Sequence, residues 1–261
     1  MDAGTEPATI EGHELASRVA THSSMRDAPA AATQPDGASI DPGSVARRSA
    51  VAFVVLVVGM LVIGGLGDLL VFAGSIGDAE ADAIGWIADH RVDAGDTVAT
   101  VGSSLSDTWT VIGVLFGAVM MLLATGRRRC ASLLVIGVSV EFVTFLVVGT
   151  VIDRPRPQVE ALHSVPSTSS FPSGHVAVAV VLYGSLTLVA RTLLPGHRVP
   201  RSTWLLPACV ALVVGCSRVY EGVHHPTDVV AGALLGLGAL VAAAYASGML
   251  ADRRPTVPDD D

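Results

Sequence analysis

Long apolar stretches divide this chain into segments of membrane length. A helix needs about 20 apolar residues to cross the hydrocarbon core of a bilayer, and six stretches near that length carry few or no charges. Charged residues make up only 15% of the chain, against roughly a quarter in average soluble domains. The sequence therefore predicts an all-α fold, a bundle of six transmembrane helices over residues 50–71, 109–125, 131–152, 176–194, 203–216 and 229–250. The fifth stretch is short, so we expect its helix to continue into residues 217–220.

The arginines predict on which side of the membrane each connection lies, because arginine is enriched in cytoplasmic connections. They gather before the first stretch and after the second, fourth and sixth: Arg47, Arg48, Arg127, Arg128, Arg129, Arg191, Arg198, Arg201, Arg253 and Arg254. The connection after the first stretch is acidic instead, as expected outside. We therefore expect a multi-pass cell-membrane protein with both termini in the cytoplasm. Its parts are a disordered tail over residues 1–46, a membrane domain over residues 47–252 and a short tail over residues 253–261.

Three more arginines lie on the side expected to be external, where topology does not require them: Arg154, Arg156 and Arg218. Guanidinium groups suit bidentate recognition of phosphate. Ser173 and Gly174 stand where the fourth stretch begins, and the N-terminus of a helix attracts anions. The alternatives are arginines that anchor the protein to lipid head groups, and a helix cap and turn at Ser173 and Gly174. The residues together favour a phosphate-binding site at the outer membrane interface.

A histidine and a carboxylate, His224 and Asp228, stand four residues apart beside Arg218. Proline is tolerated in the first turn of a helix, so we expect the sixth helix to begin at Pro226. Asp228 is then expected to hold one imidazole nitrogen of His224 and to leave the other free as a nucleophile. The alternative is that Asp228 only complements the helix N-terminus. A second histidine, His175, at the start of the fourth stretch, favours the catalytic interpretation.

These motifs resemble a known family. Pro172-Ser173-Gly174-His175, followed by Ser217-Arg218-x5-His224-x3-Asp228, is similar to the second and third signature motifs of the type 2 phosphatidic acid phosphatase superfamily. The resemblance implies a phosphatase that needs neither metal nor cofactor. His224 would attack phosphorus, Asp228 would orient His224, and His175 would protonate the leaving oxygen and then activate water. The phosphoryl oxygens would be bound by Arg156, Ser173, Gly174 and Arg218, with Arg154 as a further candidate.

The first family motif departs from its usual pattern, Lys-x6-Arg-Pro. Gly149 stands at the lysine position before Arg156, and the chain contains no lysine. We therefore expect weaker activity or an altered substrate range, because electrostatic stabilisation is a large part of phosphoryl transfer. Glu141, near the middle of the third stretch, is expected to lie away from this cluster and to serve in helix contacts.

The expected partners are the bilayer and a lipid phosphate or diphosphate with an outward-facing head group, of the undecaprenyl diphosphate, phosphatidate or phosphatidylglycerophosphate type. No surface suited to nucleic acid is predicted. Two alternatives remain. A non-catalytic lipid-phosphate binder or transporter is motivated by the missing lysine, and a vanadium-dependent haloperoxidase would share the oxyanion-binding motifs, although six membrane spans argue against it.

Overall fold

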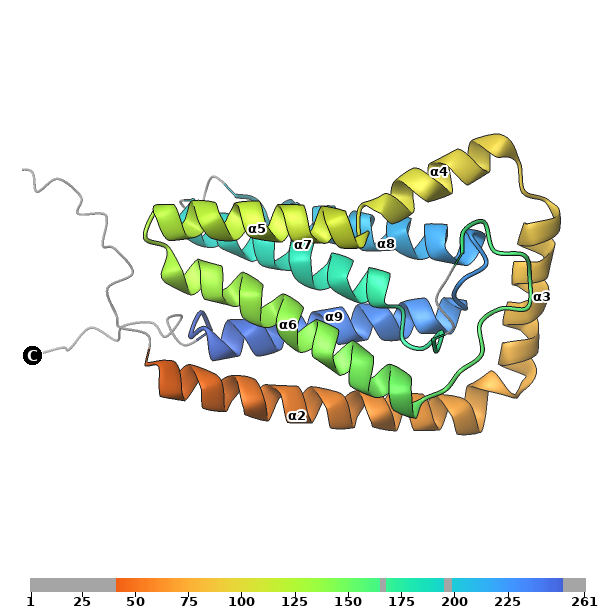
Figure 1. Ribbon diagram of the computed structural model, residues 1–261, viewed down its shortest axis with the longest axis horizontal. Coiled ribbons are helices and arrows are strands. Elements are labelled where there is room, and N and C mark those ends of the chain that lie inside the picture. The colour runs from red at the N-terminus through yellow and green to blue at the C-terminus, as the bar shows by residue number, and fades with distance from the viewer. Residues whose placement is uncertain (1–40, 165–167, 195–198, 251–261) are drawn as a thin grey trace, which may run out of the picture. The chain divides into compact units, whose positions relative to one another are not determined.

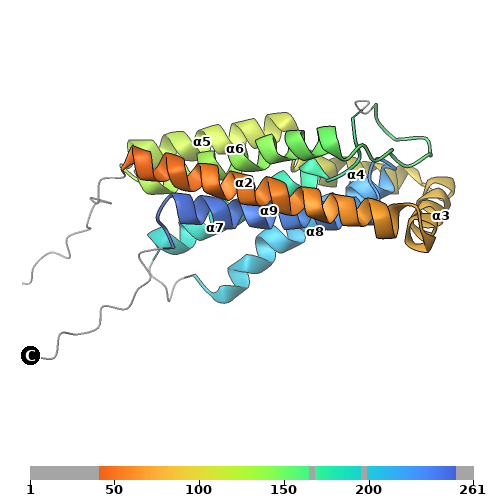
Figure 2. The same ribbon diagram turned by 90° about the horizontal axis from the view of Figure 1, so that it is seen from below.

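The computed structural model describes residues 41–164, 168–194 and 199–250, and this part of the chain is all-α. Six helical segments within it are long and apolar enough to cross a membrane: Pro42–Phe72, Asp93–Ala124, Arg128–Val151, Gly174–Leu193, Arg201–Tyr220 and Pro226–Ala246. Each overlaps one predicted stretch, and they run side by side (Figures 1 and 2). The expected all-α fold with six candidate transmembrane helices is confirmed. Residues 1–40 of the tail predicted for residues 1–46, and the tail predicted for residues 253–261, lie outside the described residues.

The first segment begins earlier than predicted. Helix α2 (Pro42–Gly67) starts with proline, whose missing N–H costs nothing in the first helical turn. The Asp41 carboxylate caps this helix by accepting the N–H groups of Gly43 at 3.2 Å and Ser44 at 3.0 Å. A π-helical turn, Asp68–Phe72, extends the segment to its far end. Residues 42–46, predicted as tail, are therefore helical.

The acidic connection predicted after the first stretch is also helical. It contains α3 (Ser75–Asp89) and α4 (Asp93–Ser104), and α4 forms the first part of the second membrane-length segment. Helix α3 lies across one end of the bundle (Figures 1 and 2). It buries Glu80 and Ile84, which are one helical turn apart, while most of its other residues are exposed. One face of α3 therefore covers this end of the bundle.

The remaining helices are α5 (Thr108–Ala124), α6 (Arg128–Val151), α7 (Gly174–Leu193), α8 (Leu205–Tyr220) and α9 (Pro226–Ala246). As predicted, α8 continues past residue 216 and α9 begins at Pro226. Helix α9 packs against α7, α6 and α2. A Cβ atom on Gly232 would lie 2.3 Å from the carbonyl oxygen of Ser173, so only glycine permits this approach. The start of α7 is therefore fixed against the first turns of α9.

Two connections meet at the end of the bundle that α3 covers, one between α6 and α7 and one between α8 and α9. The Ser170 N–H donates to the Arg154 carbonyl at 2.9 Å, which folds the first connection back on itself. The Leu162 N–H donates to the Glu221 carbonyl at 3.2 Å, which joins the two connections. Motifs that are about 50 residues apart in the sequence are thereby brought together.

Candidate active site

A cavity of about 510 Å³ lies between α5, α6 and α7 and reaches the two connections. Its lining includes five of the predicted site residues: Arg156, Gly174, His175, Arg218 and His224. Most of the remaining lining is apolar and comes from the three helices. A polar end joined to an apolar channel suits a ligand with a charged head and a hydrocarbon tail.

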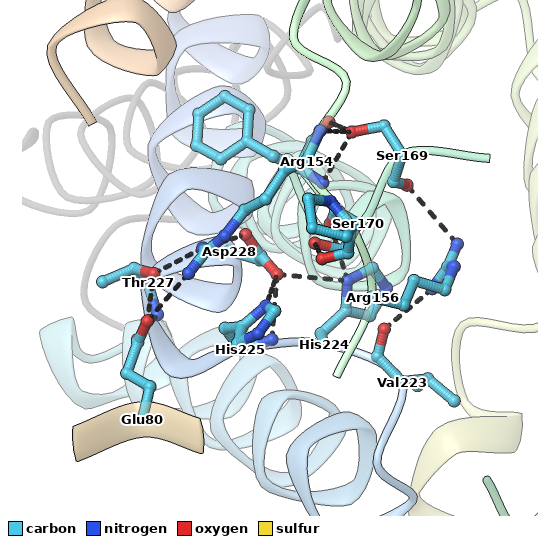
Figure 3. Close-up of polar contacts among 12 residues, drawn as sticks. Glu80, Arg154, Arg156, Ser169, Ser170, Val223, His224, His225, Thr227 and Asp228 are labelled. Carbon is cyan, nitrogen blue, oxygen red and sulfur yellow. Dashed lines mark hydrogen bonds and ion pairs between the residues drawn. The ribbon is translucent and has the colours of Figure 1, made fainter. Parts of the chain in front are cut away.

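His224 is buried, with 3% of its surface exposed, and its imidazole is held by a backbone carbonyl. Its Nδ1 lies 2.8 Å from the Ser170 carbonyl oxygen (Figure 3). A carbonyl can only accept, so Nδ1 must carry the proton and Nε2 keeps its lone pair. Burial lowers the pKa of His224 from its ordinary 6.5 to about 3, with Arg218 and Arg156 lowering it and Asp228 acting in the opposite direction. The site therefore holds a neutral imidazole of nucleophilic form at physiological pH.

Asp228 is fully buried, and its closest partners are not His224. One carboxylate oxygen pairs with Arg154 at 2.5 Å, and the other accepts the His225 N–H at 2.8 Å and lies 3.2 Å from the His225 Nδ1. The distance from Asp228 Oδ2 to His224 Nδ1 is 3.9 Å. The expectation that Asp228 directly orients His224 is therefore corrected, because the Ser170 carbonyl occupies that nitrogen. Asp228 instead contributes negative charge beside the ring.

Arg154 does not lie in the cavity, and this corrects its expected place beside the phosphate. Its guanidinium is buried between two carboxylates, pairing with Glu80 at 2.9 Å and with Asp228 (Figure 3). It also lies 3.8 Å from the centroid of the Phe72 ring. Glu80 accepts the Thr227 N–H at 2.7 Å as well, in the first turn of α9. The sequence analysis did not predict this network; the one available signal was the helical spacing of Glu80 and Ile84 in the acidic connection.

Two arginines line the cavity. Arg156 donates hydrogen bonds from Nε, Nη1 and Nη2 to the two connections, whereas Arg218 donates from Nη1. Arg218 Nη1 donates to Glu221 at 2.8 Å and to Ser103 at 3.1 Å, while its Nε has no hydrogen-bond partner among the described residues. Arg156 Nη1 donates to the Val223 carbonyl at 2.8 Å. Burial and the charge of Arg218 lower the pKa of Arg156. Two guanidiniums that repel each other in a cavity favour an anion bound between them.

The start of α7 contributes the other anion-binding groups. Ser173 occupies the capping position, yet its hydroxyl is buried and has no hydrogen-bond partner within the described chain. A Cβ atom on Gly174 would lie 3.1 Å from the Phe145 ring, so a larger residue here would press on the cavity wall. His175 Nε2 lies 3.4 Å from Asp107 Oδ1, a carboxylate partner that the sequence reasoning had missed. The first N–H groups of a helix remain available to an anion at this position.

Gly149 and Glu141, the two remaining residues considered in the sequence analysis, both lie near the predicted site. A Cβ atom on Gly149 would lie 3.7 Å from the Phe171 carbonyl oxygen, so the position faces the connection that precedes α7. Glu141 lines the same cavity as His224, which corrects the expectation that it lies away from the cluster. Among the described residues, no group of three or more histidines, cysteines or acidic residues is arranged to hold a metal ion.

Comparisons with known proteins identify the family. The model of the PAP2 superfamily matches residues 129–251. Decaprenylphosphoryl-5-phosphoribose phosphatase from Mycobacterium tuberculosis is 33% identical over 137 residues, which are 50% of this chain and 70% of that protein. The chain belongs to the PAP2 superfamily. The three predicted site residues of the last signature motif, Arg218, His224 and Asp228, fall within the matched segment.

Other relatives of this PAP2 protein match shorter regions. Undecaprenyl-diphosphatase from Sulfolobus acidocaldarius is 34% identical over 126 residues, covering 45% of this chain and 55% of the relative. Phosphatidylglycerophosphatase B from Bacillus subtilis is 39% identical over 90 residues, covering 33% and 42%. The chain thus spans about half the length of these relatives. The crystal structure of a transmembrane PAP2 type phosphatidylglycerolphosphate phosphatase from Bacillus subtilis superposes with a TM-score of 0.63 at 21% identity, covering 78% of this chain and 98% of that one, which supports the fold.

Proposed function

We propose that this PAP2 protein hydrolyses a membrane lipid phosphate or diphosphate through a phosphohistidine at His224. The observation that carries the proposal is the state of His224. It is a buried, neutral imidazole with Nδ1 bound to the Ser170 carbonyl, in a cavity that it shares with Arg156 and Arg218. A nucleophile beside two phosphate-binding cations is the arrangement that phosphoryl transfer requires.

The reaction proceeds in two steps. His224 Nε2 forms a bond to phosphorus while the bond from phosphorus to the lipid oxygen breaks, and protonated His175 gives its proton to that oxygen. Water then loses a proton to His175 and bonds to phosphorus as the bond to Nε2 breaks, which releases inorganic phosphate. Arg156, Arg218 and the backbone N–H groups at the start of α7 stabilise charge on the phosphoryl oxygens. Asp228, 3.9 Å from the ring, offsets the positive charge of phosphorylated His224.

Lipid phosphates are the substrate class that the cavity supports, because its polar end continues into apolar walls of α5, α6 and α7. Candidates are undecaprenyl diphosphate, phosphatidate and phosphatidylglycerophosphate. The names of two relatives, an undecaprenyl-diphosphatase and a phosphatidylglycerophosphatase, agree with this class.

Phosphate release in detergent micelles without added metal tests the proposal. Wild type is expected to release phosphate from at least one lipid phosphate, and His224→Ala to lose that activity. His90→Ala, a change at an exposed histidine directly after α3, serves as the matched control and should remain active. Vanadate should inhibit by imitating pentacoordinate phosphorus. Equal release by wild type and His224→Ala would exclude the phosphohistidine, and binding without release on every lipid phosphate would favour the binder or transporter.

We further propose that the site faces the outside of the cell, with both termini in the cytoplasm. The distribution of arginines between the connections supports this orientation. Gln158, exposed in the connection before α7, and Thr125, exposed at the opposite end between α5 and α6, provide matched positions for cysteine labelling. In intact cells, a membrane-impermeant maleimide should label Gln158→Cys and not Thr125→Cys. The reverse pattern would place the site in the cytoplasm.

A further inference from the structure

One carboxyl group in the cavity has no part in the proposed reaction. Glu141 of α6 is 2% exposed, lines the cavity, and forms no hydrogen bond or ion pair with any residue that the structure describes. A buried polar group normally has a hydrogen-bond partner. A carboxyl group inside a membrane-spanning helix is costly to maintain and is a functional candidate for that reason. Glu141 therefore needs a partner that enters the cavity.

The packing of α6 on α7 gives the depth of Glu141 below the phosphate end. The Phe145 ring lies against Gly174, where α7 begins. Glu141 precedes Phe145 by four residues on the same face of α6, which is about 6 Å along a helix axis. Because α6 ends near the phosphate site, Glu141 lies about one helical turn deeper in the bundle. Val178 of α7, one turn past Gly174, also lines the cavity.

A substrate whose phosphorus is at His224 would place the first atoms of its alcohol near this depth, because about five covalent bonds span ~6 Å. Glycerol lipids carry ester carbonyls or a free hydroxyl at that reach, and sugar phosphates carry hydroxyls. A polyprenyl phosphate carries only hydrocarbon there. A carboxyl group accepts from a hydroxyl or, when protonated, donates to an ester carbonyl. Only the oxygen-bearing lipids would give Glu141 a hydrogen-bond partner.

We propose that Glu141 is a specificity-determining residue, which binds a hydroxyl or ester oxygen of the substrate alcohol. This rests on the proposed lipid phosphatase function and narrows its substrate class. The enzyme accordingly prefers lipid phosphates with an oxygen close to the phosphate ester over polyprenyl phosphates. The discrimination arises because an analogue that lacks the hydrogen-bonding group leaves the buried carboxyl unpaired.

The test compares kcat/KM of the purified full chain on four monophosphates in micelles. These are a diacyl phosphatidate, its dialkyl ether analogue, a 1-alkyl glycerol phosphate with a free hydroxyl, and a polyprenyl phosphate of similar carbon number. Glu141→Leu is expected to lower the preference for the diacyl phosphatidate or for the free alcohol, relative to the polyprenyl phosphate, by roughly 10- to 100-fold, and to leave the preference for the dialkyl ether unchanged. Glu141→Gln should retain part of the preference. If kcat/KM falls on the diacyl phosphatidate alone, the ester carbonyl is the partner of Glu141. If kcat/KM falls on the free alcohol, the hydroxyl is the partner.

Thr144→Val is the matched control. Thr144 is a fully buried polar residue on the same helix that does not line the cavity, so its change should leave the preference intact. If Glu141→Leu and Glu141→Gln alter all four substrates by the same factor, Glu141 is structural and the specificity proposal is wrong, although the phosphatase function stands. If wild type hydrolyses none of the four or any other lipid phosphate, the proposed function fails and this inference fails with it.

Discussion

Replacing Glu80 with leucine is expected to destabilise the fold by about 3–5 kcal/mol, the usual cost of breaking a buried ion pair by removing one partner. The Glu80 carboxylate is 7% exposed, pairs with Arg154 at 2.9 Å, and accepts the Thr227 N–H at 2.7 Å and the Thr227 hydroxyl at 3.0 Å. Leucine removes all three contacts. Each buried donor left without an acceptor costs about 1–3 kcal/mol, which agrees with the total. Arg154 keeps Asp228 as its remaining carboxylate.

Denaturant titration in detergent micelles measures this change in the free energy of unfolding. Asp82→Leu makes the same chemical change at an exposed position of α3, and it is expected to alter stability by no more than about 0.5 kcal/mol. Activity should fall in Glu80→Leu as well, because Thr227 and Asp228 lie in the first turn of α9, three and four residues after His224. If Glu80→Leu is no less stable than Asp82→Leu, the Glu80–Arg154 ion pair contributes no more stability than a surface ion pair. In that case α3 does not stabilise this end of the bundle.

Three further predictions concern the cavity. The folded-state pKa of His224, about 3, lies below its ordinary 6.5, so its neutral form stabilises the fold fully above pH 6.5 and this contribution falls as the pH falls. Wild type should lose about 2 kcal/mol of unfolding free energy through this group between pH 7 and pH 5, and equal losses in His224→Gln would contradict the prediction. Gly149→Lys should raise kcat/KM by about tenfold by adding a cation near the phosphate; unchanged kinetics would show that the position does not reach the site. Asp107→Asn should lower kcat about tenfold by removing the carboxylate beside His175, whereas a change in KM alone would assign Asp107 to binding.

The membrane spans and the start of α9 were predictable because length, composition and proline position determine them locally. Residues 50–71 had to be helical in a bilayer, and Pro226 can occupy only the first turn of its helix. The grouping of His175, Arg218 and His224 followed from motif spacing and topology. These features depend on residues that are close together in the sequence, so a single sequence is enough to predict them.

The network around Arg154 was not predictable in the same way. Glu80 lies 74 residues before Arg154, and Asp228 lies 74 residues after it. Their pairing therefore depends on how α3 folds over the bundle. The many acidic residues of α3 concealed its buried face. The depth of Glu141 was misjudged for a related reason: position along one helix does not show how far a cavity extends between three helices. Long-range packing decided both cases.

The chemical identity of the trapped phosphoenzyme tests the proposed role of His224 most directly. Wild type, mixed with a lipid phosphate and quenched in alkali within one turnover, should carry phosphate on His224, and peptide mass spectrometry with isomer-specific antibodies locates it. Because Nδ1 of His224 is bound to the Ser170 carbonyl, we predict 3-phosphohistidine, with phosphorus on Nε2. Phosphate on Nδ1, on another residue, or on no residue during measurable turnover would contradict it.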